Sequence, residues 1–165
     1  MRLPIIISAA LLTSVSLNAP VMSQLPTQVA QSPAIANNLN FDQLIINRRL
    51  WNQQNIHSYR YTLSRSCFCV EEARGPVVIE VRNGITTSIT SVDTGMPVNR
   101  EYFQKYDTVL KLFLLIRDAI ARGASNLSVQ YDPILGYPTQ INIDYDSLIA
   151  DEEEYLTIEN FEKIN

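Results

Sequence analysis

The sequence predicts an α+β domain of two layers, in which an antiparallel sheet carries two helices on one face. Segments with helical spacing of apolar residues and segments with alternating apolar residues follow one another in the order αβββ-αβββ. The connections between the strands are short, so the strands need no crossover and pair antiparallel. We therefore expect helices on one face of the sheet and a free opposite face that is open to a partner.

Length and charge favour a single globular domain that does not bind nucleic acid. The chain has 165 residues, 46% of them hydrophobic, and a formal net charge of −4. This size is typical of one domain with its own core. No run of basic residues is longer than the pair Arg48-Arg49, so the basic surface that phosphate backbones require is absent.

Residues 1–23 have the pattern of a secretory signal peptide. Arg2 supplies the positive start, Ile5 to Leu17 form the apolar stretch, and Val21-Met22-Ser23 suit a signal peptidase. We expect cleavage after Ser23, with a site after Ala36 as the alternative. The apolar stretch is shorter than the roughly 20 residues of a bilayer span, and no Cys follows it to accept a lipid. The mature chain is therefore expected to be exported, periplasmic or extracellular, without a transmembrane segment.

The domain is predicted over residues 40–165, after a flexible leader over residues 24–39 that has no charge and no periodicity. Asn40 and Gln43 resemble a capping box, and the apolar residues that follow keep helical spacing, so a first helix is expected from Asn40 to Gln54. Alternation of apolar and polar residues then predicts a strand from Tyr59 that leads into Cys67.

A hairpin is expected between Val77 and Ser91. A two-residue turn at Asn83-Gly84 would place Ile79 opposite Ser88, an apolar residue against a polar one. A three-residue loop of Arg82, Asn83 and Gly84 instead pairs Ile79 with Thr87 and Val81 with Ile85, and buries one consistent face. We therefore expect the three-residue loop.

A second helix is expected from Thr108 to Arg122, with Asp107 as its N-cap and Gly123 as its C-terminal stop. Its apolar residues recur at helical spacing and widen to more than one side of the helix. Three more strands are expected over residues 127–131, 139–145 and 154–161.

Cys67 and Cys69 are the only cysteines and are candidates for a disulfide in an oxidising compartment. Residues two apart in an extended strand lie about 6.6 to 6.8 Å from each other, so the chain must bend there to form the bond. The pair is interpreted as a structural clip or as two thiols, in preference to a labile redox pair, because exchange sites usually space their cysteines by three.

Acidic residues crowd the end of the chain: nine of its 17 acidic residues, and one of its 13 basic residues, lie between Asp132 and Asn165. They alternate with strand and turn residues, so they belong to a folded surface. Four of them are candidates for the oxygen ligands of calcium, although their spacing does not match an EF-hand loop: Asp144, Asp146, Asp151 and Glu152. The alternative is a solvated acidic loop that protects a strand edge.

The turn between Tyr131 and Pro138 combines aromatic residues with fixed backbone. Exposed Tyr beside such a turn is good binding material, whereas a structural role is favoured because Asp132-Pro133 starts a turn and Gly136 supplies a positive φ. The candidate binding residues are Tyr131, Asp132, Tyr137, Asp144, Asp151 and Glu152.

These motifs together resemble a bacterial family known as domain of unknown function 6174, over about residues 45 to 161. The likeness rests on Trp51, Tyr59-Arg60-Tyr61, Cys67-Phe68-Cys69, Asn83-Gly84, Thr108-Val109, Leu112-Phe113, Tyr131-Asp132-Pro133, Gly136-Tyr137-Pro138, Ile143-Asp144 and Ala150-Asp151-Glu152-Glu153. The resemblance implies an exported protein and brings no catalytic or binding residues with it. This chain departs from the family pattern in having no Cys for a lipid anchor and in carrying Val70 where Pro is expected.

No catalytic motif is recognisable: a Gly-x-Ser-x-Gly elbow, a paired-His zinc helix and a Gly-rich phosphate loop are all missing from the sequence. We expect no catalytic residues and no cofactor, apart from the calcium alternative. The leading hypothesis is a non-enzymatic binding module for an unknown protein or envelope component. The alternatives are a calcium-stabilised acidic-loop protein and a thiol–disulfide redox protein that uses Cys67 and Cys69.

Overall fold

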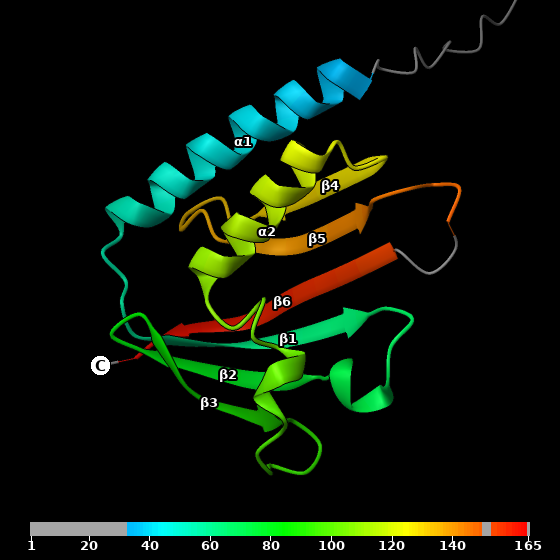
Figure 1. The fold of residues 1–165 in the computed structure, drawn as a ribbon. Coiled ribbons are helices and arrows are strands. Elements are labelled where there is room, and N and C mark those ends of the chain that lie inside the picture. Colours follow the sequence, from blue (N-terminus) through cyan, green and yellow to red (C-terminus); the bar gives the residue numbers. More distant parts are fainter. Residues whose placement is uncertain (1–32, 150–152, 165) are drawn as a thin grey trace, which may run out of the picture. The chain divides into compact units, whose positions relative to one another are not determined.

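A computed structural model of the chain describes residues 33–149 and 153–164 (Figure 1). The predicted signal peptide, its cleavage site after Ser23 and the calcium candidates Asp151 and Glu152 lie outside the described residues. In the part of the chain that is described, no helix is long and apolar enough to cross a membrane.

The described residues confirm the predicted α+β fold and the order αβββ-αβββ, with two short 3-10 helices inserted in loops. In chain order the elements are α1 (Pro33–Gln53), β1 (Tyr59–Ser66), η1 (Glu71–Ala73), β2 (Val77–Arg82), β3 (Ile85–Ser91), η2 (Arg100–Tyr102), α2 (Val109–Arg122), β4 (Asn126–Tyr131), β5 (Pro138–Asp144) and β6 (Glu153–Lys163).

The strands form one six-stranded sheet in the order β3-β2-β1-β6-β5-β4, and every neighbouring pair is antiparallel. Both helices lie over the same face of this sheet (Figure 1). The last strand, β6, pairs with the first strand, β1, and thereby joins the two αβββ halves of the chain at the centre of the sheet. Residues far apart in the sequence therefore meet along this central pair.

The core lies between the sheet and the helices, because alternate residues of the strands point toward the helices. Side chains with no exposed surface come from both layers: Tyr61, Leu63, Ile79, Ile141 and Leu156 from the sheet, Leu112 and Ile116 from α2. Burial of each large apolar side chain stabilises the fold by about 1.5–3 kcal/mol. The opposite face of the sheet is mostly polar, and includes Arg60, Thr62, Glu80, Asn142, Thr157 and Glu162.

Helix α1 starts at Pro33, so the predicted N-cap at Asn40 is wrong. Asn40 is an interior residue of α1, and its side-chain Nδ2 donates to the carbonyl oxygen of Leu127 on β4, at 3.0 Å. A polar residue that is favourable at a helix start here makes a tertiary hydrogen bond instead, and the local capping pattern did not reveal it.

Helix α2 is capped by Thr108 and not by Asp107, which corrects the predicted N-cap. The Oγ1 of Thr108 accepts from the backbone N of Lys111 at 3.2 Å. Asp107 is buried, its carboxylate accepts from the Nζ of Lys111 at 2.6 Å, and its carbonyl accepts from Thr86. The C-terminal prediction is confirmed, because α2 ends at Arg122 and Gly123 has a φ of 68°.

The three-residue hairpin loop predicted between β2 and β3 is also wrong. Arg82 pairs with Ile85, so the turn has the two residues Asn83 and Gly84. A register shift between Glu80 and Val81 then pairs Ile79 with Ile89, so that two apolar residues lie opposite each other. Thr86 occupies the inward position opposite Val81, and its hydroxyl donates to the carbonyl of Asp107 at 2.7 Å. The inward position for which the apolar pattern favoured Ile85 is thus occupied by Thr86, a polar residue whose hydroxyl has a hydrogen-bond partner.

Candidate functional site

A disulfide between Cys67 and Cys69 opens the loop that joins β1 to β2. Their Cα atoms are 5.4 Å apart, and the backbone N of Cys69 donates to the carbonyl of Cys67 at 2.9 Å. The Cα–Cα distance is shorter than the spacing of residues i and i+2 in an extended strand, so the chain bends sharply after Ser66. The loop then continues into η1.

The bend places Phe68 in solvent, with 80% of its surface exposed, and Val70 is 54% exposed. Phe68 shares a small cavity of about 210 Å³ with Ser66, Cys67, Glu153 and Tyr155. Aromatic side chains contribute much of the energy of protein interfaces when they become buried. The disulfide loop and the start of β6 thus line one cavity and bring two aromatic side chains to it, Phe68 and Tyr155, which we call the Phe68 surface.

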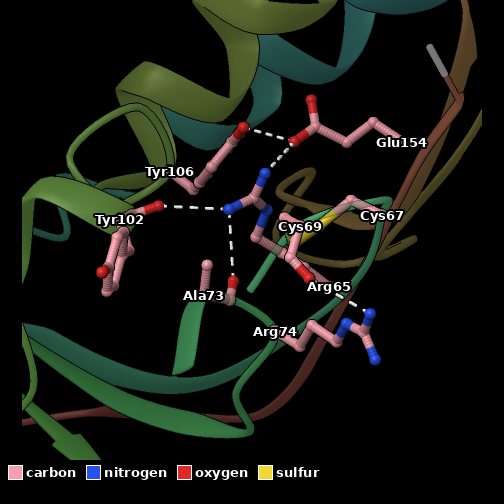
Figure 2. The surroundings of a disulfide bond; sticks show 8 residues. All are labelled: Arg65, Cys67, Cys69, Ala73, Arg74, Tyr102, Tyr106 and Glu154. Atoms are coloured by element: carbon pink, nitrogen blue, oxygen red, sulfur yellow. Dashed lines mark hydrogen bonds and ion pairs between the residues drawn. A yellow bond between two sulfur atoms is a disulfide. The ribbon is translucent and has the colours of Figure 1, made fainter. Parts of the chain in front are cut away.

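Arg65 fixes the base of this loop to three neighbouring segments (Figure 2). Its Nη1 donates to the carbonyl oxygens of Ala73 and Tyr102, each at 3.2 Å, and its Nη2 donates to Glu154 on β6 at 2.7 Å. The guanidinium also lies 4.6 Å from the ring centroid of Tyr106. One cation thus ties the disulfide loop to β6 and to the segment that precedes α2.

The far side of the loop is held as well. The backbone N of Arg65 donates to the carbonyl of Arg74 at 2.6 Å, and the Nη2 of Arg74 donates to the carbonyl of Cys69 at 3.1 Å. Hydrogen bonds to a charged group are stronger than neutral ones. The backbone that carries Phe68 is therefore already held in place, which lowers the entropic cost of ordering the loop when a partner binds.

Glu154 receives a second donor, the hydroxyl of Tyr106, on the same carboxylate oxygen that Arg65 contacts. Burial, followed by the hydrogen bond to Glu154, raises the pKa of Tyr106 well above its ordinary value, so the hydroxyl stays protonated at neutral pH and remains a donor. Two donors on one oxygen suit a positioning role for Glu154 better than proton transfer to a substrate.

Arg65 and Glu154 are not among the site residues that the sequence predicts, although their positions in the two strands carry a signal. Arg65 continues the inward-facing set of Tyr61 and Leu63 on β1, and Glu154 continues that of Leu156 on β6. Opposite charges at inward positions of two strands point to a buried pair, but only the pairing of β1 with β6 shows that they meet.

The aromatic turn is built into the core. Tyr137 is 7% exposed and packs against Trp51 and Phe161, and Tyr131 stacks on Phe113 with ring centroids 6.4 Å apart. The carboxylate of Asp132 accepts from the backbone N of Ile134 and of Leu135, at 2.9 and 2.7 Å. These three binding candidates are thus engaged by the fold.

Two of the acidic candidates, Asp144 and Asp146, lie at the other end of β5, away from the aromatic turn. Asp144 is half-buried at the end of that strand, and Asp146 accepts from the backbone N of Leu148 at 3.0 Å. Among the described residues, no three His, Cys, Asp or Glu side chains are grouped to hold a metal ion. Because Asp151 and Glu152 are not described, calcium binding stays a prediction, and a thermal melt in calcium against chelator tests it.

The comparisons with known proteins give a family and no function. Residues 43–163 match the profile of a family of unknown function, DUF6174. No curated protein and no solved structure matches the chain significantly.

Proposed function

We propose a binding function for this chain, which belongs to the family of unknown function DUF6174. In this proposal the mature protein is an exported, non-enzymatic module that engages a protein of the envelope or the extracellular space through the Phe68 surface. The observation that carries it is the 80% exposure of Phe68 on a loop held by a disulfide and by Arg65.

The charges near the Phe68 surface favour a basic partner. Glu71 and Glu72 follow Val70 and are exposed, and Glu153 lines the same cavity as Phe68. The nearest cation in the loop, Arg74, donates to the carbonyl of Cys69. An apolar socket with Lys or Arg around its rim complements this arrangement, since opposite charges steer encounter and fix orientation.

The disulfide supports the proposed export. Disulfides persist in oxidising compartments and are rare in the cytosol. The bond between Cys67 and Cys69 is therefore consistent with a periplasmic or extracellular location, as the signal-like residues 1–23 predict.

Crosslinking with a matched pair of variants tests the proposal. The mature protein is crosslinked in an envelope extract of its host, as wild type, as Phe68→Ala and as Ile134→Ala. Ile134 is the control, because it is 74% exposed but lies in the turn between β4 and β5. We expect a saturable partner whose apparent affinity falls by at least tenfold for Phe68→Ala, as for an interface hot spot, and stays unchanged for Ile134→Ala. Equal behaviour of the two variants contradicts the proposal.

A second candidate function is thiol–disulfide exchange at the same loop. Cys67 is one of the residues that line the cavity beside Phe68, so in this second proposal a partner thiolate approaches the disulfide from that cavity. Attack on the sulfur of Cys67 would form a mixed disulfide and release Cys69 as a thiolate. Thiol counting with mild reductant on the folded protein tests this function; if reduction requires denaturation, the disulfide is a structural clip.

A further inference from the structure

A second cavity, separate from the Phe68 surface, lies along α2. Its volume is about 330 Å³, within the range of small-molecule sites. Leu114 and Leu115 of α2 line it together with Tyr145, which follows β5. The charged residues that line it include Lys105, Asp118 and Arg122.

Two other charged residues line this cavity, and each is neutralised by the protein. Lys111 donates to the carboxylate of Asp107 at 2.6 Å, and Glu154 pairs with Arg65 at 2.7 Å. A ligand therefore gains little from either group, since its charge is already matched in a partly buried pair.

Lys105 is different, because it forms no hydrogen bond or ion pair with any of the described residues that line this cavity. Arg122 and Asp118 are 3.7 Å apart, and both side chains are more than half exposed, so their mutual attraction is weak. The charges left available are two cations and one carboxylate, and the cavity carries a surplus of positive charge.

Arg122 is already positioned against an apolar wall. Its guanidinium carbon lies 3.9 Å from the ring centroid of Tyr145, a geometry that holds a cation over an aromatic face. Leu114 is 36% exposed, so an apolar surface faces the same space. The site thus combines cations with aliphatic and aromatic walls.

We propose that this cavity binds a small carboxylic acid with a hydrocarbon body. The carboxylate pairs with Lys105 and Arg122, and the hydrocarbon packs on Leu114, Leu115 and Tyr145. A volume of about 330 Å³ equals that of about 11 water molecules in the liquid, so octanoate, with ten non-hydrogen atoms, is a probe of suitable size.

Calorimetric titration of the mature protein with three probes of equal chain length tests the charge preference. Octanoate is expected to bind saturably and less tightly as salt is added, because the pairing with Lys105 is screened. Octanol is expected to bind at least tenfold more weakly. If octylammonium binds as tightly as octanoate, through Asp118, the proposal is overturned. The proposal is also overturned if octanol binds with the same affinity as octanoate.

Variants locate the binding. Lys105→Gln is expected to weaken octanoate binding by about tenfold, equal to about 1.4 kcal/mol, while Lys163→Gln, at the far end of β6, leaves it unchanged. Leu114→Trp, which fills the cavity from a partly exposed position, is expected to abolish it. Binding that survives both Lys105→Gln and Leu114→Trp contradicts the proposed site. Phe68→Ala should not alter octanoate binding, so this proposal and the proposed function can fail separately.

Discussion

Arg65 and Glu154 form an ion pair of 2.7 Å between β1 and β6, with side chains only 12% and 15% exposed. The same two strands carry a second pair of equal length, between Arg60 and Glu162, whose side chains are 48% and 54% exposed. The two pairs lie on opposite faces of the sheet, and they differ in burial and in the further contacts that Arg65 makes with Ala73, Tyr102 and Tyr106.

Arg65→Met is expected to destabilise the protein by about 3–5 kcal/mol, because Glu154 is left as a buried charge without its cation. Arg60→Met is expected to cost about 0–1 kcal/mol, since an exposed pair contributes little. Urea unfolding of both variants measures the difference. If the two substitutions cost the same, the pair at Arg65 does not hold the loops as described.

Gly136→Ala is expected to be more destabilising than Gly84→Ala. Both glycines have positive φ, 81° and 78°, so each alanine carries similar backbone strain of about 1–2 kcal/mol. A Cβ at Gly136 would also lie 2.5 Å from the carbonyl oxygen of Asn47 on α1, whereas a Cβ at Gly84 meets nothing within 4 Å. The additional overlap should cost about 1–3 kcal/mol more, which thermal and urea unfolding can resolve.

Stability is expected to fall at alkaline pH because buried tyrosines must lose their protons. Burial raises the pKa of Tyr59 to about 12, and raises the pKa of Tyr61 well above its ordinary value. The folded pKa exceeds the unfolded value near 10, so this contribution to stability is complete below pH about 10 and is lost as the pH rises through about 12. Phenolate absorbance and urea unfolding, both measured against pH, should show that ionisation of the tyrosines and loss of stability occur over the same pH range.

Tyr131→Phe is expected to keep or raise the stability at neutral pH by up to about 1 kcal/mol. The hydroxyl oxygen of Tyr131 is buried and has no hydrogen-bond partner among the described residues, and its ring stacks on Phe113. Removing an unpaired buried hydroxyl removes its desolvation cost while the ring contact stays. Loss of more than about 1 kcal/mol on urea unfolding would show that the hydroxyl has a partner in solution.

Replacing both Cys67 and Cys69 with Ser is expected to have a modest effect on stability and a larger one on partner binding. The bond joins residues two apart, and closing so short a loop limits the unfolded chain by only about 1.6 kcal/mol on the chain-entropy model. Affinity should fall more strongly, because Phe68 loses its fixed presentation. Urea unfolding of the double variant measures the effect on stability, and crosslinking of the same variant measures the effect on partner binding. Unchanged crosslinking would show that the disulfide is not needed to hold Phe68 in its binding position.

The sequence by itself determined the elements and their order. Alternation along Tyr59 to Leu63 and helical spacing along Val109 to Ile120 are short-range patterns, and one buried face is enough to produce each of them. Gly123 ended α2 because a left-handed residue is a local requirement. The fold class followed from these patterns and from the short connections.

The tertiary structure decided where polar residues are used. Asn40 and Thr86 each suit a cap or a surface position locally, but the side chain of each is bonded to a distant segment. The local pattern cannot distinguish these alternatives, because the partner that satisfies a buried polar group lies elsewhere in the chain.

The same holds for the candidate sites. Cys67 and Cys69 are adjacent enough for the sequence to suggest their bond, whereas Arg65 and Glu154 are 89 residues apart and meet only because β6 pairs with β1. Phe68 gave no signal as a binding residue, since an apolar side chain is normally expected in the core. Its exposure is a consequence of the sharp bend after Ser66 and of the contacts that Arg65 makes beneath the loop.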